Sequence, residues 1–512
     1  MPEYKLIYFN LKARAELIRW IFAYGEIPYT DERIEKEDWP AMKSTIPFGK
    51  LPCLMIDGKP LHQSIAIARY VAKKAGLVPE CSLQAAYCDA IVDTVTDIGM
   101  ELYKLHVMKD EAERKKQFAE VNQKTVAPAF SDMNKKLEGQ QWIVSDKITW
   151  ADLAIGMIIG SIVNKKEELL KPYPKLASHA LKVQSLPKIK EWIDKSPKTE
   201  MGKLDGQHQV RLAFRNASYD RIQTIQSDCQ NVSESNCFEK SHTRKQVRER
   251  ERERVSVINY LYLLSGTTIN GARLRERAML ERTFCPLSLQ SDTPSISQDS
   301  VTASTSLRPA TMPEYKLIYF NLRGRAELTR WIFAYGGVPY TDERIEKDDW
   351  PAVKNTLPNG KLPCLMVDDK PLPQSQTIAR YAAKEVGLVP EDSFQSALCD
   401  AVVDTITDIA MELYKLHGMT DEEERKNQYL EVREKTVEPA LSYLEKQLDG
   451  QEWIVGEKIT WADLAIGSIL GAIVQRKEDF LASHPKLEEH VTKIQSLPKI
   501  QEWIENSPKT EM

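Results

Sequence analysis

Two nearly identical units of 201 residues make up most of the chain, and this duplication constrains its fold more than any other feature. Residues 1–201 and 312–512 both open with MPEYKLIYFN, and they align without a gap at a constant offset of 311. About 70% of the aligned positions are identical. Because solenoid repeats have periods of about 20 to 50 residues, we expect each unit to be a complete folded module.

The tryptophans follow the same duplication, and the segment between the units has none. Residues 202–311 match neither unit; they combine the alternating run RERERER at 248–254 with a Ser/Thr-rich stretch at 291–306. Because apolar residues are sparse there, we expect this segment to be largely disordered. A solvated charged linker is the favoured interpretation of the Arg/Glu run, and an RNA-contacting tract is the alternative. Adding 311 to the first five of the ten tryptophans gives the second five: Trp20, Trp39, Trp142, Trp150 and Trp192, then Trp331, Trp350, Trp453, Trp461 and Trp503.

Each unit carries its own beginning and end. The first unit ends in KTEM, as the whole chain does, and the second opens with Met312. We hypothesise that two adjacent genes have been joined into one reading frame, with residues 202–311 translated from between them. The alternative is a true fusion with a long tether. A single native species near the full 58.5 kDa would contradict the joined-gene hypothesis.

Composition and charge exclude several classes of protein. The chain has no run of 18 apolar residues and a mean hydropathy of −0.43, so we predict no transmembrane helix. The N-terminus lacks the basic and apolar regions of a signal peptide. None of the eight cysteines lies in a C-x-x-C pair, so we expect a reducing, cytoplasmic location. The net charge of −4 gives no general attraction to nucleic acid or anionic membranes.

The first part of each unit alternates strand and helix signals. Tyr4–Phe9 is rich in β-forming residues and is predicted as a strand, and Arg14–Tyr24 has apolar residues at helical spacing. Leu51–Ile56 is a second predicted strand, followed by the hairpin-turn signal Asp57-Gly58. Ser64–Ala75 is a predicted helix, with Ser64 near its start and a glycine just past its end. This order predicts a small α/β layer.

The second part of each unit has almost no strand signal. We interpret the TWAD sequence at 149–152 as a capping box, so that Asp152 is a helix cap and not a catalyst. The fold class is therefore α/β plus all-α, in duplicate. The predicted helical stretches are Cys81–Leu105, Asp110–Leu137, Trp150–Leu170 and Ala180–Asp194. The predicted domains are α/β at 1–79 and 312–390 and all-α at 80–201 and 391–512, separated by the linker at 202–311.

The chain has none of the common motifs that are defined by residue spacing: no Gly-rich phosphate loop, no H-E-x-x-H and no G-x-S-x-G. The positions of polar residues at the ends of the predicted strands and helices are more informative. Tyr8 lies at the end of the first predicted strand, next to the strand–helix loop where α/β folds bind ligands, and Arg14 begins the next helix. Gln63-Ser64 begin another helix, whose free N–H groups suit a carboxylate. With Lys43 and Lys50 nearby, this edge would favour a small, multiply anionic ligand. Each residue taken alone is better explained by surface or core packing, and it is their convergence on one edge that favours a site.

Four segments resemble the cytosolic glutathione transferases, and most closely the sigma class: YFNLxxRAELxRWIFA, KLPCL, QSxxIARY and ITWADLAIG. They occur in the family's order and spacing in both units and not in residues 202–311. The resemblance implies a thioredoxin-like N-terminal domain that holds glutathione, and a helical C-terminal domain that shapes the second-substrate site.

The resemblance also implies an activity. The enzyme would activate the glutathione thiolate for attack on electrophilic or lipid-derived small molecules. Sigma-class prostaglandin D synthases use glutathione to isomerise prostaglandin H₂ to D₂, which makes that reaction a specialised alternative. Some members of the fold are non-catalytic glutathione-binding or structural proteins, such as lens crystallins. Retention of the catalytic tyrosine in both units argues against that last interpretation.

Family roles transfer residue by residue. Tyr8 would donate a hydrogen bond to the glutathione sulfur and favour thiolate over thiol, with Arg14 as electrostatic support. Trp39 lies in the polar stretch EKEDWP, where a large aromatic suggests a ligand contact. The implied glutathione-binding residues are Trp39 and Lys43 at the glycine end, Lys50 along the groove, Leu51 ahead of the family's cis-proline Pro52, and Gln63 and Ser64 at the γ-glutamyl end. Both copies are expected to bind glutathione, because the second unit retains the whole set: Tyr319, Arg325, Trp350, Lys354, Lys361, Leu362, Gln374 and Ser375.

Two departures from the family pattern bear on activity. The family often has glycine where the first unit has Ala13, whereas the second unit has Gly324. Ala13 is unfavourable only if that position needs a positive φ. In prostaglandin D synthases a tryptophan helps to line the prostaglandin pocket, and the corresponding residues here are Lys104 and Lys415. We therefore expect glutathione conjugation more firmly than prostaglandin isomerisation.

Three aspartates recur at i, i+4 and i+8 on one predicted helix face, and such a stripe is repulsive unless something neutralises it. In the family, acidic residues on this helix meet across a dimer and bind Ca²⁺ or Mg²⁺. One position of that acidic set is Thr96 here, so we treat the metal as doubtful. The resemblance also brings Asp97 and Asp408 close to the partner unit's glutathione. The stripe comprises Asp89, Asp93 and Asp97, then Asp400, Asp404 and Asp408; the candidate metal ligands are Asp93, Asp97, Asp404 and Asp408.

The family is dimeric, and the duplication allows two arrangements. The chain could form a homodimer, or its two units could pair with each other as an intrachain pseudo-dimer. A flexible linker of this length would easily span such a pair.

Overall fold

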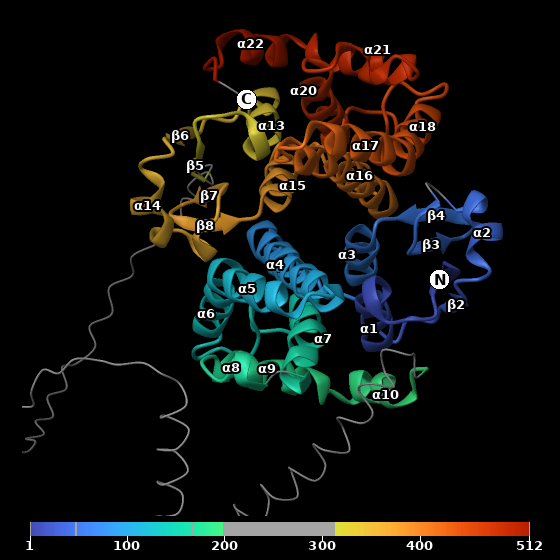
Figure 1. Cartoon of the computed structure of the whole chain (residues 1–512), viewed down its shortest axis with the longest axis vertical. Helices are drawn as coiled ribbons and strands as arrows, with labels where there is room; N and C mark the ends of the chain where they lie inside the picture. The colour runs from blue at the N-terminus through green and yellow to red at the C-terminus, as the bar shows by residue number, and fades with distance from the viewer. Residues whose placement is uncertain (1, 47–48, 166, 198–312, 511–512) are drawn as a thin grey trace, which may run out of the picture. The chain divides into compact units, whose positions relative to one another are not determined.

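A computed structural model describes residues 2–46, 49–165, 167–197 and 313–510 of the chain (Figure 1). The expected disorder of residues 202–311, and the interpretation of their Arg/Glu run, lie outside the described residues.

Each repeat opens with a four-stranded mixed sheet. In the first repeat the strand order is β2-β1-β3-β4, with β1 parallel to β2 and the other pairs antiparallel. The strand β1 has the predicted bounds, whereas β3 begins two residues later than predicted, directly after the cis peptide Leu51–Pro52. The strands are β1 Tyr4–Phe9, β2 Thr30–Ile34, β3 Cys53–Ile56 and β4 Lys59–His62.

The edge strand β2 was not predicted. Its sequence, TDERI, is mostly charged and lacks the alternation of a half-buried strand. It forms by pairing with β1 alone, and only Ile34 is buried while the other side chains keep some exposure. Charged residues are well tolerated on an edge strand, so the hydrogen-bonding partner and not the side-chain pattern decides this element.

Short helices complete the α/β domain. A 3-10 turn at Ala13–Ala15 leads into α1, Glu16–Tyr24, and α2 spans Trp39–Met42. The helix α3, Ser64–Lys74, packs against α1 and against β3 and β4 (Figure 1). Gly76 follows α3 with a φ of +67°, the conformation that glycine adopts at a helix end, so the predicted stop signal is confirmed.

The rest of the first repeat is helical, but two predicted helices are divided. The predicted helix over 110–137 contains a π turn, Asn122–Val126, just before Pro128, which cannot donate a backbone hydrogen bond. The predicted helix over 180–194 is two helices, because Pro187 opens the second. The helices are α4 Ser82–Val107, α5 Glu111–Val121, α6 Ala127–Lys136, α7 Trp150–Lys165, α8 Glu167–Leu170, α9 Pro174–Gln184 and α10 Pro187–Lys195.

The predicted role of Asp152 as a helix cap at the start of α7 is confirmed, and the complete capping box is present at its counterpart, formed by Thr460 and Asp463. The carboxylate of Asp152, fully buried, accepts hydrogen bonds from the backbone N–H of Thr149 at 2.8 Å and of Ile143 at 2.9 Å. The indole of Trp150 lies in the core beside it. Asp152 therefore fixes the first turn of α7 and is no candidate for catalysis.

The second repeat has the same architecture, which confirms the predicted α/β plus all-α fold in duplicate. Its sheet order is β6-β5-β7-β8. The counterpart of α7 is interrupted by a π turn at Ile466–Leu470. The elements are β5 Tyr315–Phe320, α13 Glu327–Gly336, β6 Thr341–Ile345, α14 Trp350–Val353, β7 Cys364–Val367, β8 Lys370–Pro373, α15 Ser375–Glu385, α16 Ser393–His417, α17 Glu422–Val432, α18 Glu438–Gln447, α19 Trp461–Ala465, α20 Gly471–Val474, α21 Pro485–Gln495 and α22 Pro498–Asn506. Across the part of the chain that the structure describes, no helix has both the length and the apolar character needed to cross a membrane.

Candidate functional site

A buried tyrosine hydroxyl lies where the first strand of each repeat ends. Tyr8 is the next-to-last residue of β1 and Tyr319 is the next-to-last residue of β5, and the two tyrosines are 6% and 5% exposed. The Tyr8 hydroxyl accepts a hydrogen bond from the backbone N–H of Arg14 at 3.4 Å, and Tyr319 accepts one from Arg325 at 3.2 Å. Burial raises the pKa of Tyr8, with the Arg14 N–H and charge opposing. The hydroxyl therefore keeps its proton near neutral pH and is available as a donor.

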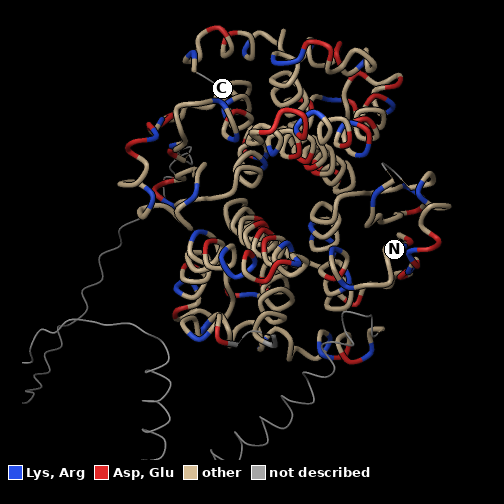
Figure 2. The backbone as a smooth tube through the Cα atoms, in the orientation of Figure 1, with Lys and Arg blue, Asp and Glu red and all other residues tan. Residues whose placement is uncertain are grey.

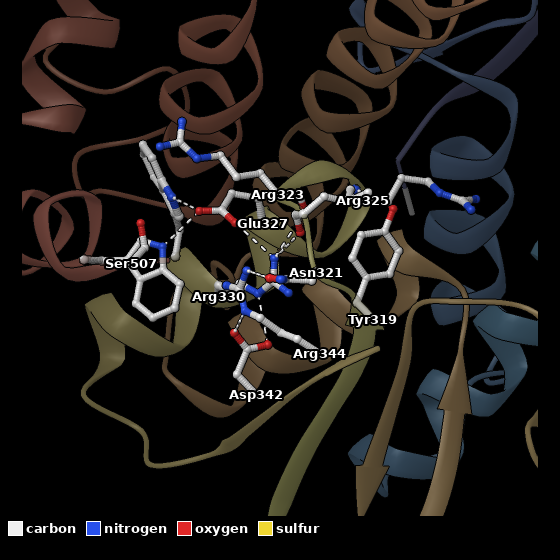
Figure 3. A network of polar contacts seen from close by, with 12 residues as sticks. Tyr319, Asn321, Arg323, Arg325, Glu327, Arg330, Asp342, Arg344 and Ser507 are labelled. Carbon is white, nitrogen blue, oxygen red and sulfur yellow. Dashed lines mark hydrogen bonds and ion pairs between the residues drawn. The ribbon is translucent and has the colours of Figure 1, made fainter. Parts of the chain in front are cut away.

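A buried arginine lies near each tyrosine, and Figure 3 shows its polar contacts in the second repeat. Arg330 is fully buried; it donates to Asp342 at 3.1 Å and to the backbone carbonyl of Leu322 at 2.9 Å, and its guanidinium lies 5.9 Å from the Tyr319 ring. Arg19 makes the equivalent contacts in the first repeat. These arginines tie the strand–helix loop to the sheet. These arginines were not predicted from the sequence, in which the available signal was a charge within an otherwise apolar helix face.

Cations gather on the loop that follows the sheet's second strand. Trp39 is half-buried and packs edge-on against Phe9 with ring centres 5.5 Å apart, so it is only partly available for a ligand. Lys43 follows one helical turn later and is exposed. A Cβ on Gly49, which has a φ of +55°, would lie 2.8 Å from Lys43 Cγ. This close approach brings Lys50 beside Lys43. The second repeat has the same arrangement with Trp350, Lys354 and Lys361.

The remaining predicted residues flank the β3–β4 hairpin. Leu51 is half-buried and precedes Pro52 through a cis peptide bond. In the second repeat Leu362 also precedes a proline through a cis peptide bond. Gln63 and Ser64 connect β4 to α3, as Gln374 and Ser375 connect β8 to α15. Gln63 and Gln374 have φ values of +68° and +76°. Such strained backbone persists where surrounding structure imposes it and is common at ligand sites.

Each of these glutamines donates hydrogen bonds to residues of the other repeat. The Gln63 amide donates to Thr405 Oγ1 and to Asp408 Oδ2, both at 3.1 Å. The Gln374 amide donates to Thr94 Oγ1 at 3.1 Å and to Asp97 Oδ2 at 3.3 Å. Burial raises the pKa of Asp97, while Lys361, Gln374 and Arg325 oppose this. Each candidate site therefore contains a carboxylate from the other repeat.

Two arginines pair with the first aspartate of each acidic stripe. Acidic residues recur along α4 and α16 (Figure 2). Arg69 pairs with Asp89 and with Asp400, both at 2.9 Å, and Arg380 pairs with Asp400 at 2.8 Å and with Asp89 at 3.4 Å. We call this set of four residues the ion ring. It joins α3 and α4 of one repeat to α15 and α16 of the other.

The structure lends no support to the Ca²⁺ or Mg²⁺ hypothesis. Within the described residues, no group of three or more His, Cys, Asp or Glu side chains is arranged to hold a metal ion. Three of the four candidate ligands instead accept hydrogen bonds from the opposite repeat: Asp97 from Gln374, Asp408 from Gln63, and Asp93 from Thr377 Oγ1 at 2.9 Å.

The pKa of the fourth candidate, Asp404, leads us to expect that the stability of the fold depends on pH. Burial raises its pKa to about 7 against the attraction of Arg380 and Arg69, with Asp400 and Asp408 adding to the rise. Burial raises the pKa of Asp93, which has the Thr377 bond, only to about 6. Ala66 is the counterpart of Thr377 and has no hydroxyl to donate.

Because the folded-state pKa of Asp404 lies above its ordinary 3.8, ionising it destabilises the fold, and stability should rise as pH falls from 8 toward 5. Asp404→Asn is expected to increase the free energy of unfolding at pH 8 by about 1 kcal/mol or more, with a smaller gain at pH 5. Urea denaturation at the two pH values checks this. A gain that does not depend on pH would contradict the assignment.

Three exposed apolar side chains form a stripe on α4. Met100, Tyr103 and Val107 are 37%, 52% and 56% exposed, and helical spacing places them on one face. Tyr103 lies close enough to Tyr8 to raise its pKa slightly. Lys104 pairs with Glu101 at 2.6 Å on the helix surface and is more than half exposed. The stripe thus offers an apolar surface beside the tyrosine, with the charge of Lys104 engaged by its neighbour.

Comparison with known proteins gives a consistent result. Residues 4–73 and 315–384 match the glutathione S-transferase N-terminal domain, and residues 96–196 and 407–507 match the C-terminal domain. Hematopoietic prostaglandin D synthase of Homo sapiens is 40% identical over 201 residues, which are 39% of this chain and 100% of the relative. Glutathione S-transferase 1 of Ascaris suum is 37% identical over 204 residues, 39% of this chain and 99% of the relative.

A solved structure, prostaglandin synthase D of Nilaparvata lugens, is 32% identical over 39% of this chain and 100% of that chain, with a TM-score of 0.37. The two sequence relatives above are covered almost completely by a segment the size of one repeat. The chain belongs to the glutathione S-transferase family and carries the family's N-terminal and C-terminal domains twice.

Proposed function

We propose that the chain is a sigma-class glutathione transferase with two active sites, which activate the glutathione thiolate for attack on electrophilic or lipid-derived substrates. The observation that carries this is the buried tyrosine hydroxyl at the strand end, which accepts a backbone N–H of Arg14 or Arg325 in the two repeats. Donation from that hydroxyl to the sulfur stabilises the charged form, and the thiolate is the nucleophile. Tyr8 and Tyr319 are the proposed catalytic residues, with Arg14 and Arg325 adding positive charge.

The charges around each tyrosine suit glutathione, which has a carboxylate at each end and one ammonium group. Trp39 and Lys43 would hold the glycine end, Lys50 would lie along the same groove, and Leu51 would pair its backbone with the cysteinyl part. Gln63 and Ser64 would hold the γ-glutamyl carboxylate at the start of α3, where free N–H groups favour anions. Asp408, within hydrogen-bond distance of Gln63, would accept the γ-glutamyl ammonium group. The second site would use Trp350, Lys354, Lys361, Leu362, Gln374 and Ser375, with Asp97 from the first repeat.

The contacts between repeats support an intrachain pseudo-dimer. Each site draws a carboxylate from the opposite repeat, and the ion ring joins the same elements. We propose that one chain forms both sites, with domains at 1–79, 80–201, 312–390 and 391–512, and that it works in the cytoplasm.

Prostaglandin H₂ to D₂ isomerisation is the second candidate. It is favoured by the 40% identity to hematopoietic prostaglandin D synthase of Homo sapiens and by the apolar stripe beside Tyr8. Incubation of the intact chain with prostaglandin H₂ and glutathione should yield the D-type product above the spontaneous background. Formation at the background rate would leave conjugation as the activity.

The experiment that tests the main proposal is glutathione-dependent turnover of an aryl halide by the intact chain. We expect conjugation that requires glutathione and that depends on Tyr8 and Tyr319 together. A chain that binds glutathione without forming thiolate or product would instead be a binding or structural member of the family.

A further inference from the structure

One position next to the catalytic hydroxyl differs between the two sites. The residue before Arg14 is Ala13, and the residue before Arg325 is Gly324. Both have a positive φ, +34° for Ala13 and +43° for Gly324. Glycine adopts this conformation freely, whereas a side chain there is strained. The first repeat therefore holds an alanine where the fold requires a conformation suited to glycine.

The alanine methyl also competes for space with the tyrosine. A Cβ built on Gly324 would lie 2.8 Å from Tyr319 Oη and 2.6 Å from Leu322 Cδ1. Such distances are too short for non-bonded contact, so the neighbours must move to accept the methyl. In the first repeat, which has the methyl, the hydrogen bond from Arg14 N to Tyr8 Oη is 3.4 Å, against 3.2 Å for its counterpart at Tyr319.

We propose that residue 13, with its counterpart 324, is a positioning residue that makes the two active sites unequal, and that the second repeat is the stronger thiolate site. This inference rests on the proposed function. The backbone N–H polarises the phenol as a donor, and the phenol in turn stabilises the glutathione thiolate. In the first repeat the methyl lengthens the first of these bonds and crowds the hydroxyl that makes the second. The atoms nearest to a Cβ on Gly324 belong to Leu322 and Tyr319, which are not the residues assigned to the ends of glutathione, so affinity for the tripeptide should be similar at the two sites.

Single-site chains separate the two sites. In a Tyr319→Phe chain only the first site retains its hydroxyl, and in a Tyr8→Phe chain only the second does. The readouts are the pH profile of kcat/KM with an aryl halide, the ultraviolet absorbance of bound thiolate, and KM for glutathione. We expect the first site to ionise the thiol about half a pH unit higher, with kcat/KM about threefold lower near neutral pH and an unchanged KM for glutathione.

Reciprocal substitutions test the cause. Ala13→Gly in the Tyr319→Phe chain should lower the thiol pKa at the first site and raise kcat/KM to that of the second. Gly324→Ala in the Tyr8→Phe chain should have the opposite effect. Ala13→Gly relieves backbone strain, so it keeps the test valid if Gly324→Ala fails to fold.

The outcomes separate this inference from the proposed function. Equal thiol pKa values in the two single-site chains, or no change on Ala13→Gly, would overturn the inference and leave the proposed function intact. Absence of thiolate and of turnover in the unsubstituted chain would overturn the proposed function and the inference with it.

Discussion

Replacing Tyr8 and Tyr319 together by phenylalanine is expected to lower kcat/KM for glutathione conjugation about 100-fold or more. The hydroxyl is the donor aimed at the sulfur, and loss of one pre-positioned donor at a developing charge typically reduces rate about 10²- to 10³-fold. The lost hydroxyls are buried and each accepts a single backbone hydrogen bond, so the fold should tolerate the change. Steady-state kinetics with an aryl halide and glutathione measure it.

A matched control is available on the same strands. Tyr4 lies on β1, on the same face as Tyr8 since residues i and i+4 of a strand share a face, and it is 5% exposed. Tyr4→Phe with Tyr315→Phe makes the same chemical change away from the candidate site and should leave kcat/KM within about twofold. Unchanged activity in the Tyr8/Tyr319 variant, or an equal loss in the control, would contradict the role of the hydroxyl.

Arg380→Ala is expected to destabilise the fold by about 3–5 kcal/mol, because breaking a buried ion pair leaves an uncompensated buried charge. Arg380 is 9% exposed and pairs with Asp400 at 2.8 Å and with Asp89 at 3.4 Å across the two repeats. Burial by itself raises the pKa of Asp400, but the two arginines outweigh it and the net pKa is lowered. Urea denaturation at pH 7.5 measures the loss.

The sign of the pH dependence follows from Asp400. Its folded-state pKa lies below the ordinary 3.8, so the stability it contributes is present above pH 3.8 and is lost as pH falls through the folded value. The difference between the unsubstituted chain and Arg380→Ala should therefore shrink in acid.

The matched control is Lys115→Ala, which breaks an exposed ion pair with Glu111 on α5 and should change stability by less than about 1 kcal/mol. Arg380→Lys keeps a charge without the planar fork and should fall between the two. Equal effects of Arg380→Ala and Lys115→Ala would show that the ion ring does not hold the repeats together.

Local sequence signals were sufficient for much of the fold. Tyr4–Phe9, the Asp57-Gly58 turn, α3 and the helix cap at Asp152 depend on residues close in sequence, and the structure has them where predicted. The strand β2 was not predicted, because it forms by pairing with β1. Its own sequence lacks the alternation of apolar and polar residues that would have indicated a strand. The divided helices were not predicted because the apolar spacing continues across the division, whereas Pro128 and Pro187 lie in the first turn of a new helix, where proline is tolerated.

In the candidate site, too, some features could be predicted from local sequence and others could not. The positions of Tyr8, Gln63 and Lys50 relative to strand and helix ends could be predicted from local elements and from the family resemblance. The hydrogen bond between Gln63 and Asp408 joins residues 345 positions apart, and no local pattern specifies it. The positive φ of Ala13 could be predicted in part, because the second unit has a glycine at the matching position.

Two double variants test whether each glutathione site contains residues of both repeats. Tyr8→Phe with Asp408→Ala places both changes in the first site, whereas Tyr8→Phe with Asp97→Ala places one in each. KM for glutathione and kcat/KM are measured for both chains and for Tyr8→Phe alone. Asp408→Ala is expected to have no further effect, because the second site is intact, and Asp97→Ala is expected to raise KM about tenfold, since loss of about 1.4 kcal/mol of binding is a factor of ten. An increase in KM on adding Asp408→Ala, with none on adding Asp97→Ala, would contradict the claim that each site contains residues of both repeats.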